Sequence, residues 1–483
     1  MFDVVLSNTY YYRFDAKQWA NQQPFPPLGT LYAAAYLRSK NYKVKVFDTN
    51  LINSPQDIAP ILKANTPKLF VIYDDGFNYL TKMCLTVMRE AAFKKIKIAK
   101  KLGCLVAISS SDATDHAETY LNEGADIIIK GEGELTLGEL TTAVLKNSDF
   151  STIDGLIYKN NGEIITNKPR VVLRDLDVLP MPAWDLISLD SYKKIWEASG
   201  KPFTLNIATT RGCPFKCNWC AKPIYGNRYN SHSPKYITKH LKYLNKTFGV
   251  SRFWMCDDIF GLKPNWVQEF NGQLQKADLK IKYFIQSRVD LLLKEDTIEA
   301  LAKSGLEEVW VGAESGSQAV LDAMDKDTKV SQIYEATRLL KEKNIRVAFF
   351  IQFGYLNETS ADIELTIKMI RELLPDNIGV SVSYPLPGTK FYDKVKDDLK
   401  LKANWTDSDD LAMMFKGSFN SNYYRKLQRY VHKIYRRSQG VFYLKSVTDS
   451  NIKTNWRLIG LLPYYAIASF VDQLQLKKLQ HHD

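Results

Sequence analysis

The 483-residue chain contains only six cysteines. So few cysteines in so long a chain do not make a disulfide scaffold, and they indicate a reducing compartment. No apolar run reaches the length needed to span a bilayer. The first residues, Met1–Ser7, lack the basic segment of a secretory leader and have the pattern of a buried strand. We therefore expect a cytoplasmic protein without a signal peptide.

The composition indicates a globular protein with sizeable cores. The chain is 45% hydrophobic and 12% aromatic, and its length suits two or three domains. Its net charge is +12, but acidic and basic residues are interspersed over most of the chain. Such a distribution is typical of a solvated surface, so nucleic acid is not an expected partner.

Residues 1–145 alternate short apolar runs with helical patterns. This alternation predicts a Rossmann-like, doubly wound parallel sheet, which binds ligands beyond the carboxyl ends of its strands. Residues 146–200 are rich in proline and polar turns and are expected to be an extended connecting strap. The expected strands are 4–6, 42–47, 69–73, 105–109 and 127–129, with a helix over 28–37.

Residues 201–395 contain a second series of strands and helices. Six units of this kind predict a partial (β/α)6 barrel, whose active site lies at the carboxyl ends of the strands. Polar residues follow several of these strands, which a purely structural core would not need. The region from 396 to 483 is expected to be a helical C-terminal tail. The expected barrel strands are 205–209, 252–255, 281–285, 308–311, 347–351 and 379–383.

Three cysteines, Cys213, Cys217 and Cys220, have the spacing Cys-x3-Cys-x2-Cys. Three thiolates on one short loop can hold a [4Fe-4S] cluster and leave one iron open. A structural zinc loop or three unrelated cysteines are the alternatives. Structural zinc usually takes four ligands in two pairs, and Cys256 has no partner cysteine or nearby histidine in the sequence.

At this loop the chain resembles the radical S-adenosylmethionine (radical SAM) superfamily. It is most similar to the branch with an N-terminal cobalamin-binding domain. Further motifs carry the resemblance: Pro26-Pro27-Leu28-Gly29, Gly131-Glu132-Gly133-Glu134, Leu179-Pro180-Met181-Pro182-Ala183-Trp184, Arg211-Gly212-Cys213-Pro214, Asp257-Asp258-Ile259-Phe260, Gly312-Ala313-Glu314-Ser315-Gly316 and Pro385-Leu386-Pro387-Gly388-Thr389. The resemblance implies that SAM completes the cluster and is cleaved on reduction to a 5'-deoxyadenosyl radical. The three cysteines are then the metal ligands and the catalytic residues.

The resemblance also implies roles for polar residues that follow the barrel strands. Asp258, with Asp257, is expected to recognise the SAM amino group, and the alternative is a helix N-cap. Ser287 and Arg288 are expected at the ribose or the SAM carboxylate, because a guanidinium binds both carboxylate oxygens. Glu314 is expected to orient Arg288 or a ribose hydroxyl. The alternative for Arg288 and Glu314 is an ordinary ion pair.

Cobalamin binding by the N-terminal domain follows only from the resemblance. The expected contacts are the loop from Ser7 to Tyr12, the serines Ser109, Ser110 and Ser111, and the segment with Gly131 and Glu132. The chain lacks the Asp-x-His-x-x-Gly motif whose histidine ligates cobalt, and serines stand where relatives often have a glycine pair. The alternative is a vestigial domain that serves only packing.

The resemblance implies a cobalamin-dependent C-methyltransferase that acts on a natural product or lipid. The alternatives are a cobalamin-independent radical SAM cyclase, oxidoreductase or RNA-modifying enzyme, and a non-enzymatic iron-sulfur protein. The expected partners are a small-molecule or lipid substrate and an external electron donor such as flavodoxin or ferredoxin. The basic, aromatic helix near 423–437 and the apolar stretch 458–471 make the C-terminal region a candidate for peripheral membrane contact.

Overall fold

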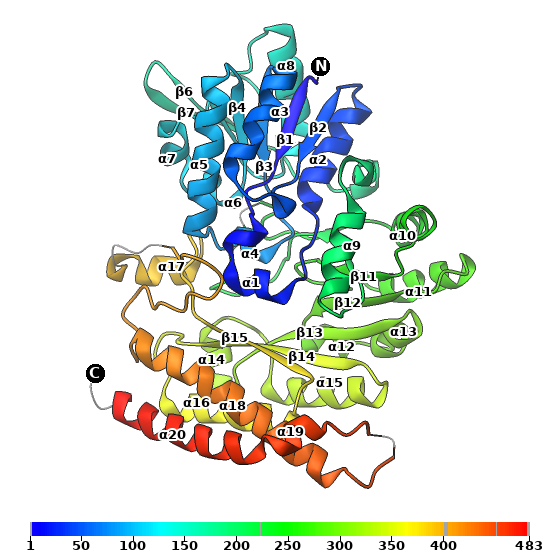
Figure 1. The fold of residues 1–483 in the computed structure, drawn as a ribbon, viewed down its shortest axis with the longest axis vertical. Helices are drawn as coiled ribbons and strands as arrows, with labels where there is room; N and C mark the ends of the chain where they lie inside the picture. The colour runs from blue at the N-terminus through cyan, green and yellow to red at the C-terminus, as the bar shows by residue number, and fades with distance from the viewer. Residues whose placement is uncertain (1, 223, 400–403, 451, 481–483) are drawn as a thin grey trace. The chain divides into compact units, whose positions relative to one another are not determined.

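The computed structural model describes residues 2–222, 224–399, 404–450 and 452–480 (Figure 1). The chain forms two compact units. The first comprises Met1–Pro214, Ala221–Ile285 and Asn404–Asp410, and the second comprises Phe215–Cys220, Gln286–Ala403 and Leu411–Asp483. The boundaries predicted from the sequence for the four regions, 1–145, 146–200, 201–395 and 396–483, stay predictions.

The first unit contains a seven-stranded sheet in the order β2-β1-β3-β4-β5-β6-β7. Its first five strands are parallel, as predicted. The order reverses between β1 and β3, and open α/β sheets bind ligands beyond the carboxyl ends of their strands at such a switch point. The parallel strands are β1 (Val4–Ser7), β2 (Val44–Phe47), β3 (Leu69–Tyr73), β4 (Leu105–Ser109) and β5 (Ile127–Ile129).

Helices cover both faces of this sheet (Figure 1). Alternate strand residues such as Val5, Phe70 and Ile108 form one buried cluster with helices α3 (Ile58–Asn65) and α5 (Thr86–Lys101). Helix α2 (Leu28–Ser39) contacts β1 and β3 and packs against α8 (Glu134–Lys146). Burial on both faces explains why these strands are continuous apolar runs. Shorter helices are α1 (Ala16–Asn21), α4 (Tyr79–Lys82), α6 (Ser111–Asp115) and α7 (Ala117–Asn122).

Part of the predicted extended strap is a β-hairpin. Strand β6 (Leu156–Asn160) pairs antiparallel with β5 and with β7 (Glu163–Thr166). Asn161 and Gly162 form the turn with φ of 49° and 87°, which is the left-handed backbone that a two-residue hairpin requires. The sequence predicted the turn but not the strands, because β7 is mostly exposed and has no apolar alternation. Helix α9 (Leu189–Ala198) follows.

The second series of strands begins in the first unit. Strands β8 (Leu205–Ile207), β11 (Arg252–Met255) and β12 (Lys282–Ser287) are parallel, with β11 paired to both of the others. Helices α10 (Pro234–Phe248) and α11 (Trp266–Lys276) connect them. The short strands β9 (Thr210–Arg211) and β10 (Asn230–Ser231) pair antiparallel and bring together the two ends of the segment that contains the cysteine loop.

The series continues in the second unit. Strands β13 (Leu306–Glu314), β14 (Arg346–Phe353) and β15 (Asn377–Val382) are parallel, with β14 in the middle. All six predicted barrel strands are therefore strands in the structure. The accompanying helices are α12 (Val289–Leu292), α13 (Thr297–Lys303), α14 (Gln318–Ala323), α15 (Val330–Glu342), α16 (Ser360–Leu373) and α17 (Lys390–Val395).

The predicted helical tail consists of α18 (Ser421–Lys445), α19 (Trp456–Gly460) and α20 (Leu462–Gln480). Helices α18 and α20 lie side by side (Figure 1), and the buried Asp472 of α20 forms ion pairs with Lys426 and Lys433 of α18. Pro463 lies in the first turn of α20, where its missing N–H costs no hydrogen bond. Among the described residues, no helix is both long and apolar enough to cross a membrane.

Candidate active site

The cysteine loop begins directly after β9 at a glycine that no other residue could replace without strain. Gly212 has φ of 77°, and a Cβ built on it would lie 2.4 Å from the carbonyl oxygen of Arg228. Cys213, Cys217 and Cys220 are all partly exposed, and none forms a disulfide. A turn joins the last two, since the Cys220 N–H donates to the Cys217 carbonyl over 3.2 Å. Partly exposed thiols on a tight loop suit a metal cluster.

Among the described residues, no three histidine, cysteine or carboxylate side chains are arranged to bind one metal ion. The four ligands of a zinc ion all contact the same atom at 2.0–2.3 Å, roughly, and must converge. The thiolates of a cubane each bind a different iron, so they stand farther apart. The choice between a cluster and the zinc alternative therefore rests on the spacing of the three cysteines.

In the second unit, Arg288 lies against the cysteine loop. Its Nη1 is 3.8 Å from the Cys217 Sγ, and its guanidinium stacks over the Phe215 ring at 3.8 Å. The Nε donates to Asp290 over 2.9 Å, which fixes the direction of the fork. Arg288 follows β12 as predicted, and Ser287 is the last residue of that strand. The remaining guanidinium N–H groups can meet an anion beside the thiolate.

Glu314 has a different partner from the one expected. It ends β13 with φ of 58°, is buried, and accepts from the Lys326 Nζ over 2.8 Å. Burial opposes the charge on Lys326, but the Glu314 carboxylate and the Cys217 thiol outweigh it and raise the pKa of the lysine. A side chain at Gly312 would displace this pair, because its Cβ would lie 2.6 Å from the Lys326 Nζ and from the Glu314 Oε1. Glu314 thus forms an ion pair with Lys326 and does not orient Arg288, whose carboxylate partner is Asp290.

In the first unit, Asp257 ties the ends of two strands together. Its buried carboxylate accepts from the backbone N–H groups of Thr209 and Thr210 over 2.6 and 2.8 Å, and also from the Thr209 hydroxyl. Burial raises the pKa of Asp257 to about 7 despite these donors. With its acceptor sites engaged by the chain, Asp257 positions the strand ends that precede the cysteine loop and Asp258.

Asp258 is partly exposed and forms an ion pair with the Lys82 Nζ of α4. The helix N-cap alternative is wrong for Asp258, because the next helix, α11, begins eight residues later at Trp266. Lys82 presents an ammonium group to this carboxylate, the kind of charge that the SAM amino group would bring. The two residues are 176 positions apart, so no local pattern could have linked them.

Glu132 belongs to a buried ion-pair network that the sequence did not reveal. Arg211 donates to Glu132 over 2.5 Å and to Glu134 over 2.7 Å, and all three side chains are at most 5% exposed. Burial raises the pKa of Glu132, while Arg211 opposes that rise. The guanidinium also lies within 5.3 Å of the Tyr32 and Tyr225 rings. The network joins the segment after β5 to the start of the cysteine loop within this unit.

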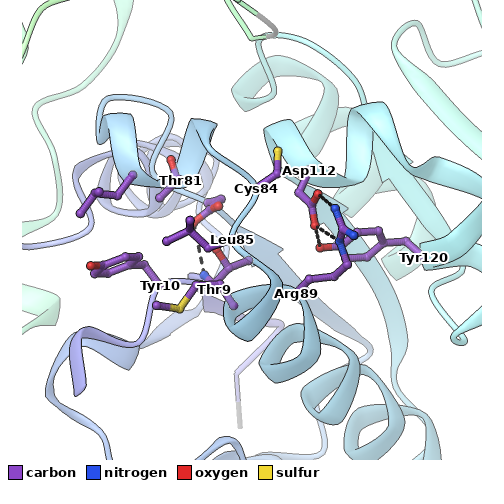
Figure 2. Close-up of a pocket in the computed structure, with 11 residues that line it drawn as sticks. Thr9, Tyr10, Thr81, Cys84, Leu85, Arg89, Asp112 and Tyr120 are labelled. Atoms are coloured by element: carbon purple, nitrogen blue, oxygen red, sulfur yellow. Dashed lines mark hydrogen bonds and ion pairs between the residues drawn. The ribbon is translucent and has the colours of Figure 1, made fainter. Parts of the chain in front are cut away.

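The loops beyond the carboxyl ends of β1, β3 and β4 enclose a small cavity with both polar and apolar lining residues (Figure 2). Its volume of about 10 Å³ is room for roughly one water molecule. The Thr9 N–H donates to Asp74 at the switch point, over 3.3 Å. Lys95, fully buried on α5, donates to the Ser7 hydroxyl over 2.9 Å, and burial lowers its pKa to about 7.

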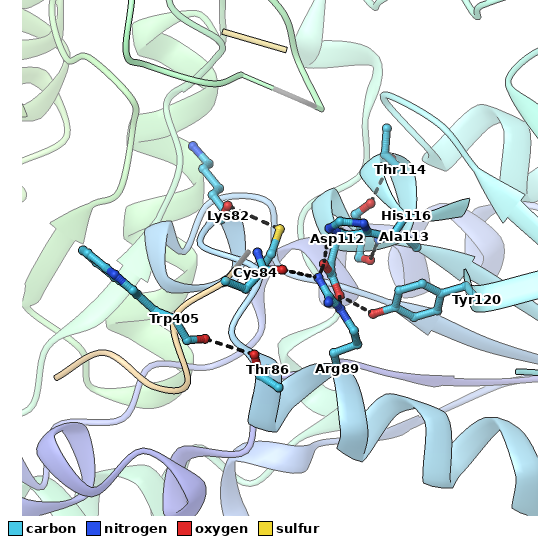
Figure 3. Close-up of polar contacts among 12 residues, drawn as sticks. Lys82, Cys84, Thr86, Arg89, Asp112, Ala113, Thr114, His116, Tyr120 and Trp405 are labelled. Atoms are coloured by element: carbon cyan, nitrogen blue, oxygen red, sulfur yellow. Dashed lines mark hydrogen bonds and ion pairs between the residues drawn. The ribbon is translucent and has the colours of Figure 1, made fainter. Parts of the chain in front are cut away.

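On the side of β4, a second polar cluster closes the cavity (Figure 3). Arg89 donates to Asp112 through Nε over 2.7 Å and also contacts the Asn404 side chain, while the Tyr120 hydroxyl donates to Asp112. Ser110 accepts from the Ala113 N–H over 2.9 Å and so caps α6. Ser109 and Ser111 are buried beside it.

These loops suit a corrin chemically but are closed in this conformation. The Tyr11 hydroxyl, just beyond β1, is buried and has no hydrogen-bond partner among the described residues, which is a position for a ligand or a water. The neighbouring segment contains Gly131 and Gly133, which have no side chain to occupy space. A Cβ on Gly133 would lie only 2.9 Å from the Tyr73 ring. The polar atoms therefore fit the amide-rich rim of a cobalamin, and the space must open before a corrin enters.

Comparison with known proteins identifies the class. Residues 207–370 match the model of the radical SAM superfamily. The chain is 30% identical over 389 residues to an uncharacterized methyltransferase, PH0819, of Pyrococcus horikoshii, covering 79% of this chain and 81% of the relative. The chain therefore belongs to the radical SAM superfamily and is an enzyme of that class.

Two further comparisons extend the similarity beyond the matched segment. The chain is 26% identical to the anaerobic magnesium-protoporphyrin IX monomethyl ester cyclase of Rubrivivax gelatinosus, covering 78% of this chain and 67% of the relative. It is also similar in fold to the cobalamin-dependent radical enzyme OxsB, solved with aqua-cobalamin, with a TM-score of 0.74 and 19% identity over 99% of this chain and 72% of that one. The predicted fold class is confirmed.

Proposed function

We propose that this protein is a cobalamin-dependent radical SAM C-methyltransferase. The observation that carries the proposal is the combination of a three-cysteine loop after β8 with a switch-point sheet whose polar loops suit a corrin. The relative named a methyltransferase and the fold similarity to a cobalamin-dependent enzyme support it. The alternative reaction is a radical cyclisation, which is suggested only by the name of a relative.

The protein's residues have separate tasks in this proposal. Cys213, Cys217 and Cys220 hold the cluster, and Arg288 and Asp258 bind the carboxylate and the ammonium of SAM. The loops after β1, β4 and β5, including Ser109 to Ser111 and Gly131, hold cobalamin. When bound, the reduced cluster and SAM supply a radical that removes hydrogen from an unactivated carbon, and cobalamin supplies the methyl group. The buried strand ends keep water from the reacting groups.

The SAM contacts can be tested by charge removal. Arg288→Met and Asp258→Asn are each expected to weaken SAM binding about 10- to 150-fold, because a hydrogen bond to a charged group contributes roughly 1.5–3 kcal/mol. Equilibrium binding of SAM to the reconstituted protein gives the dissociation constants. Lys82→Met is the matched control: it removes an ammonium that competes for Asp258, so SAM affinity should not fall. Unchanged affinity in both test variants would move the SAM site elsewhere.

The cobalamin site can be tested by filling it. Ser110→Trp places an indole beside the cavity of about 10 Å³ and is expected to abolish retention of hydroxocobalamin on gel filtration. Release of 5'-deoxyadenosine from SAM should persist, because Ser110 contacts neither the cysteine loop nor Asp258. Ser110→Ala, which removes only the α6 cap, should retain cobalamin. Wild-type cobalamin binding by Ser110→Trp would contradict this location.

The substrate class, the electron donor and the cellular location of the protein are also proposals. We infer a small-molecule or lipid substrate and a one-electron donor such as flavodoxin or ferredoxin, because the cluster must be reduced before each cleavage. A reducible cluster and six cysteines that form no disulfide favour the cytoplasm. Contact with a membrane surface through the C-terminal helices would bring a lipid substrate within reach.

A further inference from the structure

The C-terminal helices concentrate the positive charge of the chain. Residues 411–483 contain twelve lysines and arginines but only three aspartates and no glutamate, a net charge of +9 out of +12 for the whole chain. One of those aspartates, Asp472, is buried between Lys426 and Lys433. The charged residues of this region are therefore mostly basic, whereas the charges of the remaining 410 residues are nearly balanced.

Helix α20 has a buried side and, opposite to it, an exposed apolar side. One side carries Ser469, Asp472 and Leu476 and is buried. The other carries an exposed row in which each residue follows the last by three or four positions, and these side chains are 43–68% exposed: Tyr464, Ile467, Val471 and Leu474. A soluble surface helix normally turns polar residues outward. The row ends at Lys478, with Lys477 beside it, both exposed.

Other exposed apolar side chains lie on the neighbouring elements of the same region. Phe442 and Leu444 are at the end of α18, Val447 follows it, and the Trp456 ring at the start of α19 is 66% exposed. Exposed tryptophan and tyrosine beside lysines are typical of a helix that lies in the interface of a bilayer. We call the exposed row of α20 with these four side chains the apolar face.

A broad basic groove in the second unit adjoins these helices. It has a volume of about 1320 Å³ and is lined by the last turns of α15 and α16 and by residues of α18 and α20. Among the described residues, five of its cations form no ion pair. The Lys341 Nζ donates instead to two backbone carbonyls, which leaves four: Arg371, Arg437, Lys445 and Lys453. The groove lies by Arg346 and Asp376, at the amino ends of β14 and β15. The candidate active-site residues follow the carboxyl ends of the strands, so this groove is a separate surface.

We propose that the apolar face and the basic groove bind the surface of an anionic lipid bilayer. The apolar side chains enter the acyl boundary, while the four cations of the groove meet lipid phosphates. Charge complementarity selects this occupant: the region carries +9, and each lysine or arginine near an anionic surface strengthens binding about fivefold. A second copy of the chain is disfavoured, because it would bring two such basic surfaces together.

Vesicle flotation of the full-length protein tests the proposal. The wild type should float with vesicles of phosphatidylcholine and phosphatidylglycerol in equal parts, and should not float with phosphatidylcholine alone. Lys477→Glu with Lys478→Glu should weaken binding at least about 25-fold, and Ile467→Ser with Val471→Ser about tenfold or more. Bound protein should dissociate as salt is raised.

Matched control variants distinguish binding through this surface from non-specific adsorption to vesicles. Val171→Ser with Val178→Ser removes two apolar side chains elsewhere that are 72% and 63% exposed. Lys276→Glu with Lys280→Glu reverses two exposed lysines outside the region. Both controls should float like the wild type. Equal binding to the two kinds of vesicle, or unchanged binding by the α20 variants, would overturn the proposal. So would a stable dimer in light scattering that Ile467→Ser with Val471→Ser dissociates. SAM cleavage is measured alongside, so failure of the membrane proposal leaves the proposed function standing.

Discussion

Replacement of any one of Cys213, Cys217 and Cys220 by alanine is expected to abolish the iron-sulfur cluster and SAM cleavage together. Three thiolates and SAM supply the four ligands of a cubane, and no other cysteine lies on the loop to substitute for a lost one. Anaerobically reconstituted wild type should contain about four irons per chain. Iron and sulfide content, and 5'-deoxyadenosine released after reduction, measure the effect.

The other cysteines are the controls. Cys84 and Cys104 are buried in the first unit, so Cys84→Ala and Cys104→Ala should keep both iron and SAM cleavage. A full cluster in any variant of the three loop cysteines would disprove the ligand assignment. Equal loss of iron in the two control variants would mean that folding, and not ligation, was being measured.

Arg211→Met is expected to lower the free energy of unfolding by about 3–5 kcal/mol. Arg211 is the shared ion-pair partner of Glu132 and Glu134, and it is 3% exposed. Its removal leaves two buried carboxylates without a cation, and burial already raises the pKa of Glu132. Urea denaturation of the cluster-free protein measures the loss. It should be larger at pH 8 than at pH 5, where protonation relieves the carboxylates that have lost their cation.

Two matched variants test the reason for this loss. Arg38 forms an exposed ion pair with Asp185, so Arg38→Met should cost at most about 1 kcal/mol. Addition of Glu132→Gln and Glu134→Gln to Arg211→Met removes the uncompensated charges and should recover most of the lost stability. If the triple variant is no more stable than Arg211→Met, packing against Tyr32 and Tyr225 is the main contribution of the arginine.

The strands could be predicted because buried parallel strands leave a strong local pattern. Each residue of Leu69–Tyr73 is buried, and a run of five apolar residues is typical of a strand that is covered on both faces. Strand β7 escaped prediction because an exposed edge strand needs no such run. Strand β6 begins with the short buried run Leu156, Ile157 and Tyr158, which the prediction missed. The division of the chain into two units depends on contacts between distant segments, which no local pattern encodes.

The candidate site was predictable only where chemistry follows sequence spacing. The cysteine loop and the polar residues after the strands have that property. The spacing of Lys82 and Lys326 in the sequence did not reveal their partners. The folded chain places Lys82 beside Asp258 and Lys326 beside Glu314. Of the two contacts expected for Glu314, the one with Arg288 is replaced by an ion pair with Lys326 from the loop after α14. The contact with a ribose hydroxyl stays a prediction.

The most direct test of the proposed function is methyl transfer to cobalamin on the protein. Reconstituted protein loaded with hydroxocobalamin is gel-filtered, reduced and mixed with SAM carrying a deuterated methyl group. We expect about one corrin per chain, deuterated methylcobalamin by mass spectrometry, and separate release of 5'-deoxyadenosine that requires Cys217. Release of 5'-deoxyadenosine from protein that retains no corrin would contradict the cobalamin-dependent function and favour the cobalamin-independent cyclase.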